Sequence, residues 1–101
     1  MRRKADFERL LQRGARLSVE GYTFYLGRRQ GGEPRLGMLV SRKHSARAVE
    51  RNRLKRCIRE AFRLSQESLG AVDLLVRPPF GMKASRDMVM GLQRLLGRLC
   101  S

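Results

Sequence analysis

Apolar residues recur at helical spacing in three segments of the chain. The first covers residues 4–13 and the second residues 48–69, each followed directly by a glycine that can cap a helix. The third begins at Ser85 or Arg86 and ends at Leu99, and the Ser85 hydroxyl can cap its first turn. This spacing predicts three helices, of which the middle one is the longest.

Alternation with a period of two predicts a strand around residues 22–26. Tyr22, Phe24 and Leu26 fall on one side of that strand, and Tyr25 falls on the other. For Tyr25 the residues leave two interpretations open. It is either an ordinary sheet aromatic packed on a helix or an exposed ring available to a ligand.

Further strands are predicted at residues 35–41 and 73–77, and a weakly marked one at residues 16–19. The segment "QGGEP" has turn composition, so we expect the strands at 22–26 and 35–41 to pair as an antiparallel hairpin. The order α-β-β-α-β-α, with the possible additional strand, predicts a two-layer α/β (α+β) sandwich. A length of 101 residues suits a single domain, spanning residues 1–101.

The long predicted helix has two faces of opposite character. At about 100° per residue, one face can dock on a sheet and carries Leu54, Cys57, Ile58, Ala61 and Phe62. The opposite face carries a connected polar stripe made of Asn52, Lys55, Arg56, Arg59 and Arg63, flanked by Arg51 and Arg53. Glu60 follows Arg56 by four positions and can offset part of one positive charge.

Charge makes this stripe informative. The chain has 23 Lys+Arg against 9 Asp+Glu, a formal net charge of +14. Residues 42–63 hold nine basic side chains and two acidic ones, whereas a helix face that is merely solvated mixes the two signs. Like charges at helical spacing cost about a few tenths of a kcal/mol per pair. We expect a bound polyanion to offset that cost. The pattern favours a nucleic-acid partner, since arginine donates in a fork to phosphate oxygens.

Other kinds of site find little support in the residues. The carboxylates are scattered, no Cys/His metal-ligand set or Gly-rich phosphate loop is present, and His44 is expected to be a polar surface residue of a loop. We therefore expect no catalytic residue, no metal or cofactor bound by the protein alone, and no small-molecule substrate. Cys57 is expected to be a small buried hydrophobe and Cys100 an incidental thiol. No secretory signal is read at the N-terminus, so a cytoplasmic location is the default.

The segment "ERNRLKRCIREAF" (residues 50–62) resembles the Arg-Asn-Arg signature of the bacterial ribonuclease P protein subunit, RNxxKRxxRE followed by an aromatic. The rest of the chain is similar to that family in the same order. "ADFERLLQRG" resembles its first helix, "RLGMLVSRK" its strand ending in paired basic residues, and "DLLVRP" with the leucine-rich last helix its final strand and helix. The resemblance covers roughly residues 4–99.

The resemblance implies an α-β-β-β-α-β-α sandwich with a small mixed sheet and a left-handed βαβ crossover, an exception to the usual handedness. It also implies a protein subunit of an endoribonuclease whose catalysis resides in the RNA, with magnesium held through that RNA. The activity implied is removal of the 5′ leader from precursor tRNA. The residues expected to bind the catalytic RNA are Arg51, Asn52, Arg53, Lys55, Arg56, Arg59 and Arg63. Those expected to bind the single-stranded leader are Phe7, Leu11, Tyr25, Arg42 and Lys43.

Two rival functions fit part of the sequence. A ribosomal or other structural RNA-binding protein explains the charge equally well, but not the ordered agreement with the family. A basic amphipathic membrane binder would leave a large apolar face exposed, whereas the predicted strands supply a surface that covers it. No apolar run approaches the roughly 20 residues needed to span a bilayer.

Overall fold

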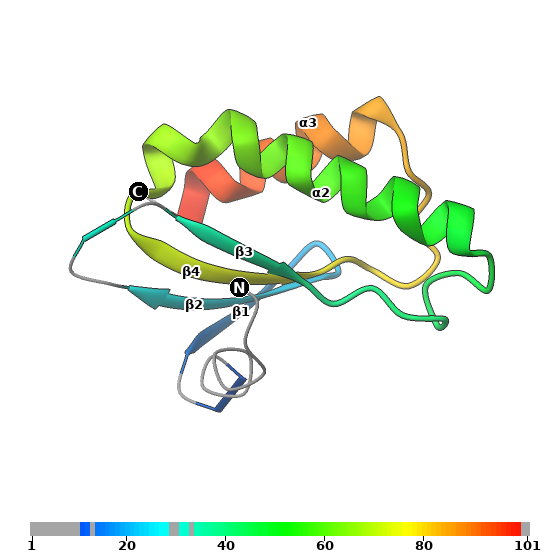
Figure 1. Ribbon diagram of the computed structural model, residues 1–101, viewed down its shortest axis with the longest axis horizontal. Coiled ribbons are helices and arrows are strands. Elements are labelled where there is room, and N and C mark those ends of the chain that lie inside the picture. The colour runs from blue at the N-terminus through cyan, green and yellow to red at the C-terminus, as the bar shows by residue number, and fades with distance from the viewer. Residues whose placement is uncertain (1–10, 13, 29–30, 33, 100–101) are drawn as a thin grey trace.

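A sheet of four strands carries two helices on one of its faces (Figure 1). The computed structural model describes residues 11–12, 14–28, 31–32 and 34–99. Of the expected first helix, Leu11 and Gln12 are described and helical, and the remainder, with Phe7, lies outside the described residues. The other two expected helices and all four strands are present, so the predicted two-layer mixed fold is confirmed.

The strands follow the order β1-β2-β4-β3 across the sheet. Strand β2 is antiparallel to both of its neighbours, β1 and β4, and β3 is parallel to β4. Because α2 connects these two parallel strands, β3, α2 and β4 form the expected βαβ unit; its left-handed sense stays a prediction. The strands are β1 (Ala15–Val19), β2 (Tyr22–Arg28), β3 (Arg35–Met38) and β4 (Val72–Arg77).

The predicted hairpin between the second and third strands is wrong. Strand β4 lies between β2 and β3 and pairs with both. Its apolar side chains are buried on both faces of the sheet, and a strand of that kind belongs in the interior of a sheet. Strand β3 is also shorter than the expected 35–41, because it ends at Met38. Beyond that end, the Leu39 N–H still donates a hydrogen bond of 2.9 Å to the Val76 carbonyl of β4.

The tight hairpin joins β1 to β2 instead. Val19 pairs with Tyr22, which leaves a loop of two residues, Glu20 and Gly21. Both have positive φ, 51° and 85°, as a type I′ turn requires. The weakly marked strand at 16–19 is thereby confirmed as β1, and the structure shows that it pairs with β2 at the edge of the sheet.

Helix α2 (Ala48–Leu69) and helix α3 (Arg86–Leu99) begin and end as the sequence predicts. Gly70 ends α2 with φ 69°, and the Ser85 hydroxyl accepts a hydrogen bond from the Met88 N–H at 3.2 Å in the first turn of α3. The predicted apolar face of α2 is buried apart from Cys57, which is half-buried against the core and is a free cysteine.

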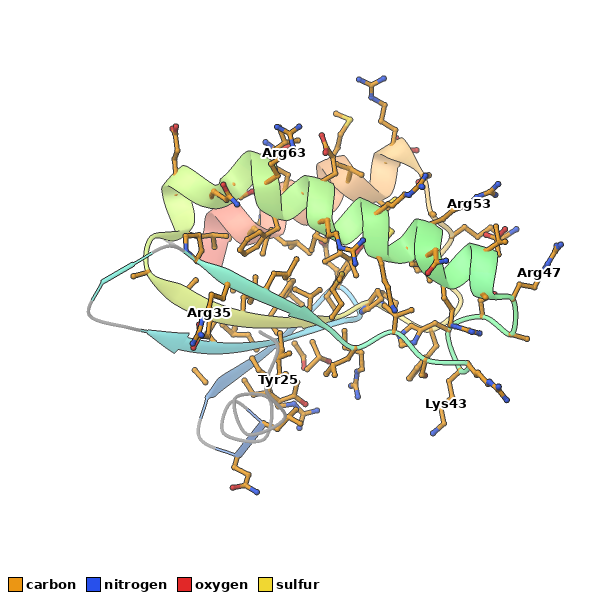
Figure 2. The ribbon with its side chains drawn as sticks, in the orientation of Figure 1. Tyr25, Arg35, Lys43, Arg47, Arg53 and Arg63 are labelled. Atoms are coloured by element: carbon orange, nitrogen blue, oxygen red, sulfur yellow. The ribbon has the colours of Figure 1, made fainter. Side chains whose placement is uncertain are left out.

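The core lies between the helices and one face of the sheet. Phe24 and Leu74 are fully buried there, and Tyr22 stacks on Phe24 with ring centroids 5.8 Å apart. Burial raises the pKa of Tyr22 to about 12, because the phenolate would lose its hydration. Since side chains alternate along β2, Tyr25 points to the opposite face, away from α2 and α3 (Figure 2). The sheet therefore separates a helix-covered core from a second face that carries Tyr25.

Candidate nucleic-acid interface

The outer face of α2 forms a basic surface, the α2 ridge, made of Asn52, Lys55, Arg56, Arg59 and Arg63. All five are exposed except Lys55, which is half-buried. Arg53 and Arg63 project from the side of α2 that faces away from the sheet (Figure 2). The two faces predicted for this helix are thus confirmed, with the apolar one in the core and the basic one in solvent.

Carboxylates neutralise some cations of α2 and leave others unpaired. Glu60 bonds Arg63 at 2.6 Å, rather than Arg56 as its spacing suggested, and Glu50 bonds Arg53 at 3.3 Å. The hydrogen bonds donated by Arg63 lower the pKa of Glu60 below its ordinary value. Within the part of the chain that the structure describes, no side-chain hydrogen bond or ion pair involves the remaining members of the ridge, Asn52, Lys55, Arg56 and Arg59.

Arg51 has a different environment from the ridge. Its guanidinium donates hydrogen bonds to the backbone carbonyls of Ser45, at 3.0 Å, and Ala46, at 3.1 Å. These bonds tie the loop before α2 to the first turn of that helix. Arg51 therefore has a positioning role in the loop.

A cavity of about 470 Å³ lies at the same end of α2. Arg47 and Glu50 line it from the start of the helix, and Lys83 lines it from the loop after β4. Arg47 precedes the helix without a side-chain cap. This cavity places two further cations beside the ridge.

Of the leader-binding candidates that the structure describes, Tyr25 lies on the second face of the sheet. Tyr25 is half-buried and pairs with Leu75 of β4, whose side chain is fully buried although it lies outside the helix-covered core. Lys43 and Arg42 are exposed in the turn after β3, and Leu11 is exposed. With Phe7 outside the described residues, its approach and that of Leu11 to Tyr25 stay predictions.

A cavity of about 510 Å³, the sheet-end cavity, opens where β3 and β4 finish. It is lined by residues 38–41, Lys43, His44, Arg77 and Phe80. Lys43 is the predicted leader-binding residue among these, and Arg42, its neighbour, lies outside the lining.

His44 is not the surface residue expected from its loop position. It is 8% exposed, and both ring nitrogens are hydrogen-bonded. The Ser41 N–H donates to Nδ1 at 3.0 Å, so Nε2 carries the proton and donates to the Pro78 carbonyl at 2.9 Å. The imidazole thereby joins the end of β3 to the end of β4, two segments 34 residues apart in the chain. Local sequence patterns do not predict a contact over that separation.

Two residues that line the sheet-end cavity, Arg77 and Phe80, were not singled out from the sequence. The Arg77 guanidinium donates to the Thr23 hydroxyl at 3.1 Å and lies 5.8 Å from the centroid of the Phe80 ring. Two features of the sequence could have indicated these residues. Arg77 follows Leu75 by two positions and so shares its face of β4, and Phe80 is an aromatic residue inside an otherwise loop-forming "RPPFG" segment.

Metal and membrane chemistry gain no support from the described residues. Across residues 11–12, 14–28, 31–32 and 34–99, no three His, Cys, Asp or Glu side chains lie together as metal ligands would. No helix in that same part of the chain is both long enough and apolar enough to cross a membrane.

Comparison with protein families gives one match along nearly the whole chain. A family model described as Ribonuclease P matches residues 1–100. The ribonuclease P protein component of Nitrosococcus oceani is 40% identical over 91 residues, which cover 88% of this chain and 76% of that protein. That of Serratia proteamaculans is 45% identical over 78 residues, covering 74% of this chain and 66% of that protein.

Solved structures agree with the sequence relatives. The RNase P protein of Staphylococcus aureus superposes with a TM-score of 0.78 at 28% identity, covering 97% of this chain and 88% of that one. The RNase P protein of Thermotoga maritima gives a TM-score of 0.75 at 26% identity, covering 97% of this chain and 94% of that one. The similarity therefore extends from the basic helix to the whole fold.

Proposed function

The chain belongs to the ribonuclease P protein family, and from that premise we propose that it acts as the protein subunit of a ribonucleoprotein endonuclease that removes the 5′ leader from precursor tRNA. In this proposal the α2 ridge binds the catalytic RNA, and the sheet face with Tyr25, together with Lys43 in the turn after β3, binds the single-stranded leader. Catalysis belongs to the RNA, whose phosphates hold the magnesium, and the complex works in the cytoplasm.

The observation that carries the proposal is the unpaired charge on α2. Lys55, Arg56 and Arg59 lie on one helix face without an acidic partner in the described part of the chain. Such a surface is unfavourable in isolation, and RNA phosphates supply the missing counter-charge at each position. Arginine also binds two phosphate oxygens at once, which suits a folded RNA backbone.

The sheet face supports the second contact. Tyr25 lies outside the helix-covered core, and cationic side chains accompany it on the same face of the sheet and in the turn after β3. Aromatic faces beside cations bind single strands with little sequence preference. A subunit that must accept many different leaders needs that kind of contact.

Reconstitution with the cognate RNA subunit and a precursor tRNA tests the proposal. Purified protein alone should leave the precursor intact, and its addition to the RNA subunit should lower the magnesium concentration needed for cleavage. Robust cleavage by RNA-free, nuclease-free protein would contradict RNA-borne catalysis. Recovery of ribosomal RNA as the main bound species would favour a structural RNA-binding protein.

A further inference from the structure

Phe80 is an exposed aromatic ring at the edge of the sheet-end cavity. It is 56% exposed, and it is the one aromatic among the large hydrophobic side chains that are exposed in the described part of the chain. Single exposed aliphatic side chains are common on protein surfaces. An exposed ring at the edge of a cavity of about 510 Å³ offers a flat apolar surface that a ligand can cover.

His44 holds this ring in place from beneath. The two ring centroids lie 4.5 Å apart with planes inclined by 44°. His44 is itself fixed, because one ring nitrogen accepts from the Ser41 N–H and the other donates to the Pro78 carbonyl. A ring supported in this way loses little conformational freedom when a ligand binds, which lowers the cost of association.

The loop that carries Phe80 is held at two further points. The Met82 N–H donates to the Pro79 carbonyl at 3.2 Å, closing a turn around Phe80. Gly21, in the turn between β1 and β2, packs so closely that an added Cβ would lie 2.9 Å from Cγ of Pro79. The ring is therefore presented by a braced turn.

Two cations lie near the ring. The guanidinium carbon of Arg77 lies over the Phe80 ring, 5.8 Å from its centroid, and the guanidinium is oriented by its bond to the Thr23 hydroxyl. Lys43 lines the same cavity with an exposed side chain. An aromatic face with cations beside it matches the repeating chemistry of a single nucleic-acid strand, in which each base is linked to a phosphate.

We propose that Phe80 is a base-stacking platform for one nucleotide of single-stranded RNA, with Arg77 and Lys43 placed for the adjoining phosphates. The proposal rests on the proposed leader-binding function and adds a subsite to it. The pairs Tyr25–Leu75 and Thr23–Arg77 follow each other on the same face, about 7 Å apart along the strands. One continuous strand can therefore reach both aromatic rings.

Equilibrium binding by the reconstituted holoenzyme tests the platform. Phe80→Leu keeps an apolar contact with His44 but removes the π face, and Phe80→Ala removes both. Each should weaken binding of a precursor tRNA with a full leader by about five- to 150-fold, the range for loss of one stacked base, and leave mature tRNA binding unchanged. Met90→Ala, an exposed residue on α3, is the matched control and should change neither.

A fluorescence measurement keeps the test decisive if either variant folds poorly. The chain contains no tryptophan, so Phe80→Trp introduces a single reporter that retains the aromatic face. Its emission in the holoenzyme should be quenched by leader-bearing precursor and not by mature tRNA, while affinity stays at the parental level. Met90→Trp should show no such difference.

The outcomes separate this proposal from the one on which it rests. If the parent holoenzyme prefers precursor over mature tRNA but Phe80→Leu keeps that preference, or Phe80→Trp emission does not respond, Phe80 only covers His44 and the platform is refuted. If the parent shows no preference for the leader-bearing precursor, leader binding itself is refuted, and the platform with it.

Discussion

The α2 ridge and the sheet-end cavity are two basic surfaces built in different ways. The ridge is one helix face whose members, such as Arg56 and Arg59, are neighbours because of helical periodicity. The cavity joins the ends of β3 and β4 with the loops that follow them, so that Lys43 and Phe80 meet although 37 residues separate them in the chain. The first is a property of a segment, and the second is a property of the fold.

Their local chemistry differs as well. The ridge contains cations without acidic partners in the described residues, a surface suited to the phosphates of a structured RNA. The sheet face carries Tyr25 and Arg77, and the adjoining sheet-end cavity adds Lys43 and Phe80, a surface suited to unpaired bases. The comparison predicts that the two surfaces can be damaged separately.

The largest expected effect comes from the core that both surfaces share. Ile58 is fully buried where α2 packs on the sheet, so Ile58→Ala should lower the free energy of unfolding by about 2–5 kcal/mol. Urea unfolding measures the change. The adjacent Arg59→Ala alters an exposed side chain and should stay within about 0.5 kcal/mol of the parent. Similar losses for the two variants would mean that α2 is not anchored through this face.

A smaller and more selective loss is expected at the sheet face. Tyr25→Ala should weaken holoenzyme binding to leader-bearing precursor by about 1–3 kcal/mol, because one stacked base loses its partner. Binding of mature tRNA should be unaffected, and Tyr25→Phe, which keeps the ring, should resemble the parent. Equal losses for precursor and mature tRNA would show that Tyr25 serves only to pack the sheet.

Substitutions in the α2 ridge should change the salt dependence of binding to the RNA subunit. Arg56→Ala or Arg59→Ala removes an unpaired, exposed cation and should flatten the salt dependence of binding to the RNA subunit by roughly one unit in the logarithmic slope. Titrations at several salt concentrations give the slope. Arg63→Ala is the matched control, since that arginine is already bonded to Glu60 and should matter less.

An unchanged slope for Arg56→Ala and Arg59→Ala would mean that this helix face is simply solvated. Leader preference offers a second readout. Both variants should keep the parental ratio of precursor to mature tRNA affinity, since neither residue belongs to the sheet face.

The smallest expected effect concerns the ion pair at the end of the ridge. Hydrogen bonds from Arg63 lower the pKa of Glu60 below 4.5, so the carboxylate is favoured in the folded state. The stabilisation is present above pH 4.5 and is lost as pH falls through the lowered pKa. An NMR titration of the Glu60 carboxyl should show that its pKa lies below 4.5, and Arg63→Ala should return this pKa toward 4.5. A titration that Arg63→Ala leaves unchanged would rule out the pair in solution.

Much of the fold follows from local patterns. The limits of α2 and α3, the caps at Gly70 and Ser85, and the burial of Ile58 were all predictable, because periodicity and capping act within a few residues. The same locality made the α2 ridge predictable.

Strand partners and loop contacts were not predictable in the same way. The hairpin expected between β2 and β3 failed because β4, distant in sequence, has the more apolar side chains and takes the interior position. His44 was expected in solvent, and its burial includes a bond to the Pro78 carbonyl that joins the end of β3 to the end of β4, 34 residues away in the chain.

By itself the sequence determined the helices, the basic ridge and the family, since each depends on the order and spacing of neighbouring residues. Only the tertiary structure decided which strands pair and which side chains from separate segments share a cavity. The physical reason is that hydrogen bonds between strands and packing between loops join residues at any separation along the chain. Phe80, supported by His44 and flanked by Arg77, acquires its candidate role entirely through such contacts.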